Sequence, residues 1–274
     1  MAEFSGHLSL CAAGRANGRT VLAAQSFRAP YHVSKPYWDA DTGVLLVQVV
    51  NPTAGILSGD RLESDVKVGE GAALLVTTPS ASRVFRMKSG SAECRQSFAV
   101  AQGGWLEVMP EPLVPHRGCT YRQTTRIEVA NGGAIFYADL LVSGRVAHGE
   151  GWGWDRLILE NEVTVGETLA LRERFDQTGA DLKVLAALAG SGPAACFGNA
   201  VLIPDRAQAD ESWRRELAAL HQDGLWLGVS RLRTAGWSIK FVAPSTARLK
   251  QALREIRGIL APAFPRLACD PRKL

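Results

Sequence analysis

Histidine and cysteine, the side chains best suited to tight metal binding or nucleophilic chemistry, are scattered along this chain. Its five histidines never come within four residues of one another, which excludes the HExxH zinc pattern. Its five cysteines form no CxxC pair, which excludes zinc-ribbon and thioredoxin-type sites. His116 and Cys119 form the one local pair, and a structural cysteine beside a surface histidine explains them better than a nucleophile with its base.

The phosphate-binding and hydrolase motifs are also missing. The sequence contains no GxxxxGK[ST] loop and no GxGxxG turn, and residues 55–59 read G-I-L-S-G instead of the GxSxG nucleophile elbow. A single sequence excludes neither a cysteine or serine nucleophile with a distant histidine nor acid-base chemistry by paired carboxylates. Enzymatic activity is therefore the less favoured interpretation.

The composition is that of a globular protein. The chain has 274 residues, 46% of them hydrophobic and 21% charged, with a net charge of +4. Its basic residues are dispersed, whereas nucleic-acid-binding proteins concentrate them on one face. The sequence has neither a signal-peptide pattern nor an apolar run of about 18 residues. We therefore expect a cytoplasmic protein with reduced thiols that binds neither nucleic acid nor membrane.

Short alternating runs broken by glycine predict a mainly β structure. Residues 66–74 align with residues 98–106 and 127–135, at spacings of 32 and 29 residues, and a weaker copy begins 36 residues later at Val163. Each copy reads as a strand, a tight turn with glycine at a fixed position, and a second strand. Stacked copies would form a layered, coil-like, β-solenoid-like body. An ordinary β-sandwich built from similar hairpins is the alternative.

The last quarter of the chain has a different pattern. Apolar residues recur at helical spacing in residues 211–222 and again in 245–260, where Ser245 is the expected N-cap. Residues 226–233 and 237–242 have the character of two strands joined near Gly236. We predict one domain over residues 1–274, with a β body at about 1–189 and a helix-strand-strand-helix part at about 199–274.

Four segments have residue patterns too distinctive for ordinary connecting loops. They are N-P-T-A-G-I-L-S-G-D-R-L at 51–62, T-T-P-S-A-S-R-V-F-R at 77–86, W-L-E-V-M-P-E-P-L-V-P-H-R-G at 105–118 and G-R-V-A-H-G-E at 144–150. In this order and spacing they resemble the UreD (also UreH) family of urease accessory proteins. The resemblance is good over residues 42 to about 175. Ser58 departs from the glycine usual in the family, and Asp139 from a common glutamate.

The resemblance implies a non-catalytic protein with a mostly β fold and a small helical part. It also implies binding to the urease apoprotein, to the accessory protein UreF and to the GTPase UreG. Together these proteins deliver nickel to urease, and the family is associated with a water-filled passage through this subunit. We accordingly expect no tightly bound cofactor, only nickel(II) in transit.

Carboxylates and water hold a divalent ion loosely, which suits a passage, whereas tight nickel sites use imidazole and thiolate. The candidates for the nickel passage are Asp60, Asp139, Glu150 and Glu173. Structural roles compete with this hypothesis. Asp60 could cap a turn, Asp139 and Glu150 flank Arg145 and could pair with it, and the strand residue Glu107 could pair with an arginine.

Partner binding has its own candidates. The prolines around Glu111 and Pro112 predict a rigid, extended segment. Trp152 and Trp154 in a glycine-rich stretch are candidates for exposed anchors, and packing in the core is the alternative for both. The partner-binding candidates are Glu111, Pro112, Arg117, Trp152 and Trp154, and the candidates for a structural or passage-lining role are Thr77, Thr78, Arg83 and Arg145. The arginines could pair with carboxylates across an interface or line the passage.

Two alternative functions stay open from the sequence. One is a small-molecule hydrolase or isomerase that uses a carboxylate pair on a β scaffold. The other is a β-rich interaction protein with no role in metal delivery.

Overall fold

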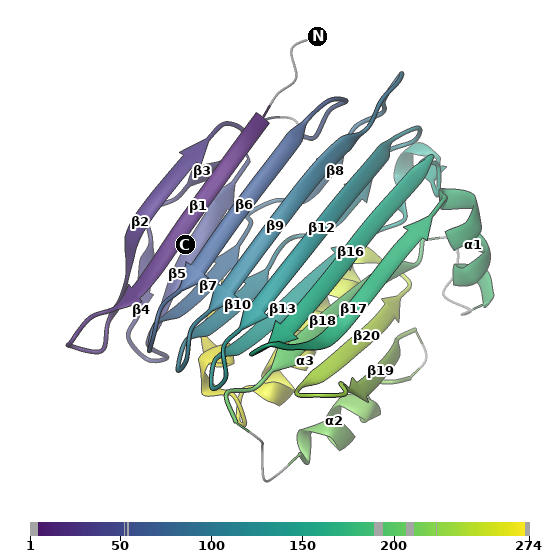
Figure 1. The fold of residues 1–274 in the computed structure, drawn as a ribbon. Helices are drawn as coiled ribbons and strands as arrows, with labels where there is room; N and C mark the ends of the chain where they lie inside the picture. Colours follow the sequence, from purple (N-terminus) through teal and green to yellow (C-terminus); the bar gives the residue numbers. More distant parts are fainter. Residues whose placement is uncertain are drawn as a thin grey trace.

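A computed structural model describes residues 5–51, 53, 55–188, 194–206, 211–222 and 224–271. These residues form three layers, which are an outer sheet, a middle sheet and a group of helices on the far face of the middle sheet (Figure 1). The outer sheet has the strand order β17 (Thr168–Gln177), β16 (Arg156–Val165), β12 (Thr120–Val129), β9 (Ala92–Val100), β6 (Arg61–Val68), β1 (Ser5–Gly14) and β2 (Thr20–Arg28).

The middle sheet lies behind the outer sheet in Figure 1. Its order is β19 (Trp226–Arg231), β20 (Trp237–Ala243), β18 (Cys196–Ile203), β13 (Ala134–Leu141), β10 (Trp105–Met109), β7 (Ala73–Thr77), β5 (Val44–Val50) and β3 (His32–Val33). Short strands extend it at β4 (Tyr37–Asp39), β8 (Ser82–Val84) and β11 (Leu113–Pro115), and β14 (Gly144–Arg145) pairs with β15 (Glu150–Gly151). The helices are α1 (Gly179–Leu188), α2 (Trp213–Ala219), α3 (Thr246–Leu260) and the 3₁₀ turns η1 (Val146–His148) and η2 (Pro265–Ala268).

The chain coils between the two sheets, which confirms the predicted solenoid-like body. Each of the three clear repeats gives its first strand to the outer sheet and its second to the middle sheet, and equivalent strands pair in parallel. The register matches the sequence repeat residue for residue: Val66 pairs with Phe98, Phe98 with Ile127 and Ile127 with Val163. The two strands of each of these three repeats belong to different sheets, so they are not the hairpins of the sandwich alternative. The weaker fourth copy is such a hairpin, because β16 and β17 pair antiparallel within the outer sheet.

The glycine turns stack on one another at the crossing from the outer to the middle sheet. Gly71, Gly103 and Gly132 occupy the same position and have φ of 64°, 68° and 78°, a backbone region in which other residues are strained. Successive turns are joined by backbone hydrogen bonds, such as the 2.8 Å bond from Gly103 N–H to Gly132 C=O. The glycine at a fixed position is therefore a backbone requirement, as predicted.

The two sheets differ in burial, and their sequences reflect it. The outer sheet has one face in solvent, so β6 and β12 alternate between exposed and buried residues. The middle sheet is covered on both faces, so every residue of β7 is buried and β5 is a nearly continuous apolar run. One apolar core lies between the sheets, and a second lies between the middle sheet and helices α2 and α3.

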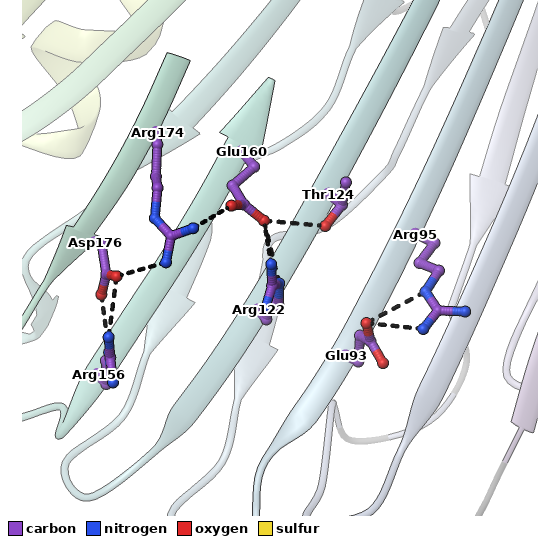
Figure 2. A network of polar contacts seen from close by, with 8 residues as sticks. All are labelled: Glu93, Arg95, Arg122, Thr124, Arg156, Glu160, Arg174 and Asp176. Atoms are coloured by element: carbon purple, nitrogen blue, oxygen red, sulfur yellow. Dashed lines mark hydrogen bonds and ion pairs between the residues drawn. The ribbon is translucent and has the colours of Figure 1, made fainter. Parts of the chain in front are cut away.

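The solvent face of the outer sheet carries charges of alternating sign on neighbouring strands (Figure 2). Glu160 pairs with Arg122 and with Arg174, each at 2.7 Å. Hydrogen bonds from Arg156 and Arg174 hold the pKa of Asp176 well below its usual value. Because exposed ion pairs contribute at most about 1 kcal/mol each, this lattice makes the face hydrophilic more than it stabilises the fold.

The C-terminal part has the predicted helix-strand-strand-helix order. Strands β19 and β20 form an antiparallel pair, and the Ser245 hydroxyl caps α3 by accepting a hydrogen bond from Arg248 N–H at 3.2 Å. Helix α1 was not predicted, because the two hydrophobic side chains it buries among those described, Leu182 and Ala186, give little helical periodicity. None of the helices in the described part of the chain has the length and apolar character needed to cross a bilayer.

Helix α3 is tied to the β body by a buried ion pair. Arg257 donates to both oxygens of Glu107 on β10, at 2.6 and 3.2 Å, and also to the Cys269 carbonyl at 2.9 Å. This confirms the expectation that Glu107 pairs with an arginine. Burial raises the pKa of Glu107 although Arg257 opposes the shift, so desolvation outweighs the attraction. The pair therefore specifies where α3 docks more than it stabilises the fold.

Replacing one partner of the Glu107–Arg257 pair should lower the free energy of unfolding much more than replacing both. We expect Glu107→Gln to lower the free energy of unfolding by about 3–5 kcal/mol, because it leaves Arg257 buried without a counter-charge. The double change Glu107→Leu with Arg257→Met should recover most of that loss. Urea denaturation measures both, with Arg172→Gln in an exposed pair as the control at about 1 kcal/mol or less. Equal losses in the single and double variants would contradict this explanation.

Two turn glycines should respond differently to alanine. At Gly133 a Cβ would lie 2.7 Å from the Ala101 carbonyl oxygen, and backbone cannot move aside easily. At Gly71 no atom lies within 4 Å, so only the positive φ is strained, at about 1–2 kcal/mol. We expect a lower urea midpoint for Gly133→Ala than for Gly71→Ala. The reverse order would show that the coil does not limit the approach of neighbouring turns.

Candidate functional site

The four specific segments of the sequence lie largely in the four connections that return the chain from the middle sheet to the outer sheet. They are residues 51–60, 78–91, 110–119 and 142–155, and we call them the motif side. Each segment is hydrogen-bonded to the next. Ile56 N–H donates to Arg83 C=O at 2.8 Å, Ser82 N–H to Pro112 C=O at 3.0 Å, and Val142 N–H to Leu113 C=O at 3.1 Å. Segments that are far apart in sequence thus form one surface.

A cavity of about 890 Å³ lies between the two sheets. Its walls are mostly apolar, but one row of polar side chains crosses it. The row occupies a single register position of the outer sheet, since neighbouring members are paired residues in adjacent strands. From β6 to β17 its members are Ser64, Gln96, Thr125, Asn161 and Glu173, and all of them except the fully buried Thr125 line the cavity.

Asp139 faces this row from β13 of the middle sheet. Its carboxylate accepts hydrogen bonds from the Tyr137 hydroxyl and, at 3.1 Å, from the Asn161 side-chain amide. The Tyr137 hydroxyl also lies 3.4 Å from Thr125 Oγ1. One polar network therefore joins the two sheets through the apolar core.

The surroundings of Asp139 make its charged form costly. Burial raises its pKa to about 6, although the bonds from Tyr137 and Asn161 favour the carboxylate. The negative charge of Glu173 acts in the same direction as burial. At neutral pH this group is mostly an incompletely compensated anion, and a cation beside it would relieve that cost.

Glu173 is the second carboxylate at this end of the cavity. Lys240 on β20 pairs with it at 2.6 Å, and the same ammonium donates to Asn199 Oδ1 at 3.3 Å. Lys240 already balances the charge of Glu173. The carboxylate that lacks a positive counter-charge is therefore Asp139. A divalent cation bound by both carboxylates would have to displace the lysine or share Glu173 with it.

Three further predicted residues line the same cavity, namely Thr77, Thr78 and Glu111. Thr77 Oγ1 donates to Met109 C=O at 2.7 Å, and Thr78 Oγ1 accepts from Glu111 N–H at 2.8 Å. Glu111 pairs at 2.7 Å with Lys250 of α3. These threonines fix the ends of β7 and β10, so their role is structural as well as lining.

Asp60 and Glu150 do not join Asp139 and Glu173 in this cavity. Asp60 caps the turn before β6 by accepting a hydrogen bond from Leu57 N–H at 2.8 Å. Glu150 lies 3.7 Å from Arg145 across the β14–β15 hairpin. Asp60 and Glu150 therefore have the structural roles that competed with the nickel hypothesis. Asp139 does not pair with Arg145, because its hydrogen bonds go to Tyr137 and Asn161.

The expectation that Trp152 and Trp154 are exposed is wrong. They are 7% and 3% exposed and pack against each other in a third core with the ring centroids 5.6 Å apart. Glycine-rich sequence around a tryptophan reflects close backbone packing here, since Gly153 lies against Arg117. Arg117 donates to Gly149 C=O at 2.7 Å and so holds the neighbouring hairpin.

Within the described ranges no three histidine, cysteine, aspartate or glutamate side chains are grouped to hold a metal ion. The cavity instead offers carboxylate, amide and hydroxyl oxygens, which bind divalent ions loosely. The sequence analysis missed most of these groups. One sequence signal could have identified them, namely a polar residue at a position where the alternating pattern of the strand expects a buried apolar one. This signal identifies Ser64, Gln96, Thr125 and Asn161.

The raised pKa of Asp139 makes a pH-dependent contribution to stability. A carboxyl whose pKa is higher in the folded state stabilises below its unfolded value, near 3.8, and this contribution is lost as pH rises through about 6. The total loss is about 3 kcal/mol. As pH rises from 5 to 7.5, the wild type should lose this contribution and Asp139→Asn should not. The free energy of unfolding of the variant, relative to that of the wild type, should therefore increase by on the order of 1 kcal/mol between these two pH values. Urea unfolding at both values measures this, and a pH-independent difference would contradict it.

Comparisons with known proteins agree with this arrangement. The family model described as UreD urease accessory protein matches residues 5–273. The urease accessory protein UreD of Opitutus terrae is 63% identical over 272 residues, covering 99% of this chain and all of the relative. That of Yersinia pseudotuberculosis is 33% identical over 260 residues, covering 92% and 80%. The chain therefore belongs to the UreD family of urease accessory proteins, and its role lies in urease maturation.

Proposed function

We propose that this chain is a non-catalytic subunit that binds the urease apoprotein together with UreF-type and UreG-type accessory proteins. In this proposal nickel(II) is cargo, and it passes through the cavity between the sheets on its way to urease. No cofactor is tightly bound. Dispersed basic residues and free thiols support a cytoplasmic protein that does not bind nucleic acid.

The observation that carries the nickel proposal is the environment of Asp139. A partly buried carboxylate with a pKa of about 6 binds a divalent cation favourably, because the ion supplies the missing positive charge. Asn161 and Glu173 place further oxygens on the same register row. Cation and proton compete for Asp139, so occupancy should fall as pH drops below about 6.

Release is as important as binding for a passage. Oxygen ligands without imidazole or thiolate hold nickel weakly. Lys240 already occupies Glu173 at 2.6 Å and competes with an arriving cation. The ion would therefore meet Asp139 as its strongest partner and leave without a large barrier.

Association with other proteins is supported by exposed apolar side chains on the helical part and its hairpin. Val184 and Leu185 of α1 are 62% and 51% exposed, and Trp226 at the start of β19 is also exposed. The stacked motif side adds a rigid surface that contains Glu111 and Pro112. Preordered segments lose little entropy when a partner binds.

A carboxylate-pair enzyme is less well supported. Both oxygens of Asp139 accept hydrogen bonds, and Lys240 holds Glu173, so neither carboxyl is free to exchange a proton with a substrate in this arrangement. We therefore propose passage and not catalysis.

The test compares cavity carboxylates with an outer-face carboxylate in cells that carry the urease genes. We expect Asp139→Asn and Glu173→Gln each to lower urease activity and nickel content per urease severalfold. Glu162→Gln is the matched control, because Glu162 is paired with Arg172 on the solvent face of the same sheet and should leave both unchanged. Nickel content is measured by elemental analysis of purified urease.

Co-purification with apo-urease separates loss of passage from loss of folding. A variant that still binds apo-urease and yields nickel-poor urease supports the proposal. Normal nickel content in a variant that carries both Asp139→Asn and Glu173→Gln would refute the cavity as the route. Normal urease in cells without the gene would refute the maturation role of this chain.

A further inference from the structure

A second pocket, of about 630 Å³, opens on the motif side and is distinct from the cavity between the sheets. It lies where β8, β11 and the β14–η1 hairpin meet the first turn of α3. Its polar lining comes from three of the four motif segments and from α3. The groups used below are Arg83, His116, Ser143, Arg145, His148 and Thr246.

The charged residues that line this pocket are all positive. Arg83 and Arg145 both contribute, and no aspartate or glutamate occurs among its described lining residues. Glu150 partly balances Arg145 across the hairpin, at the long distance of 3.7 Å. No described residue forms an ion pair or a side-chain hydrogen bond with Arg83. The pocket therefore keeps at least one uncompensated guanidinium group.

His116 supplies a second, independent observation. Its side chain is only 5% exposed and lines the pocket, yet no described residue hydrogen-bonds its ring. Phe85 packs edge-on against it, with centroids 4.8 Å apart at 68°. Burial and the positive charge of Arg145 lower its pKa, and Arg83 and His148 act in the same direction. An imidazole without a hydrogen-bond partner among the described residues thus faces the pocket, where two arginines outnumber the one opposing carboxylate, that of Glu150.

The first turn of α3 completes the pocket. Ser245 satisfies Arg248 N–H, which leaves the N–H groups of the first turn, including that of Thr246, without acceptors inside the helix. The positive end of the dipole of this 15-residue helix therefore points to the same place as the two arginines. Hydroxyl groups of Ser143 and Thr246 are further donors in the lining.

We propose that this pocket binds a small oxyanion, a phosphate or a carboxylate group, through Arg83, Arg145, His116 and the N-terminus of α3. An oxyanion is the ligand that every polar group here can donate to, and arginine recognises such groups with two parallel hydrogen bonds. A divalent cation would be repelled. The pocket therefore lies outside the proposed nickel route.

The test is calorimetric titration of the full chain with inorganic phosphate and, separately, with acetate at neutral pH. We expect Arg83→Gln to weaken binding about tenfold or more, because a charge-assisted hydrogen bond is lost. Arg145→Gln should act likewise. Arg126→Gln on the solvent face of β12 removes the same charge at an exposed position and should bind as the wild type does.

The pattern of results decides the proposal. Arg83 is exposed, so its variant should fold normally even if Arg145→Gln does not, and circular dichroism checks both. Preference for phosphate over acetate assigns a tetrahedral dianion, and the reverse preference assigns a carboxylate. No saturable binding of either ion, or equal binding by the wild type, Arg83→Gln and Arg126→Gln, overturns the proposal.

Discussion

The parallel pairing of successive coils is the constraint on which the rest of this structure depends. Once Val66, Phe98, Ile127 and Val163 share one register position, every other residue of the four outer strands is placed as well. A polar residue at the same place in each repeat then becomes a polar row inside the protein. The connecting segments also stack, so that motifs separated by tens of residues become neighbours.

The second constraint is that the middle sheet must be covered on both faces. The outer sheet covers one face, and helices α2 and α3 cover the other. Glu107 and Arg257 lie within the second interface, where desolvation exceeds their attraction. Because apolar replacements of buried ion pairs are often neutral or stabilising, we infer that this pair serves to fix the position of α3. That position matters, because the first turn of α3 also lines the motif-side pocket.

The molecule separates two kinds of electrostatic environment. Inside the coil, Asp139 is an anion in a mostly apolar cavity and favours a cation. On the motif side, Arg83 and Arg145 surround an unbonded imidazole and favour an anion. The solvent face of the outer sheet has alternating charges that largely cancel (Figure 2). The proposed cation and anion sites therefore lie where charges are incompletely paired, and not on the face whose charges cancel.

The sequence alone predicted the repeated strand-turn-strand units, the turn glycines and the helix-strand-strand-helix end, because these depend on local periodicity and on backbone geometry at single residues. It favoured a coil but left a sandwich of hairpins open, and the parallel pairing of equivalent strands decided for the coil. It also contained the family motifs and four carboxylates, including Asp139 and Glu173. Only the tertiary structure decided that Asp139 meets Tyr137 and Asn161, that Asp60 and Glu150 have structural partners, and that both tryptophans are buried. Arg257 meets a partner 150 residues away. Such pairings depend on how sheets and helices pack, and local sequence patterns carry no information about them.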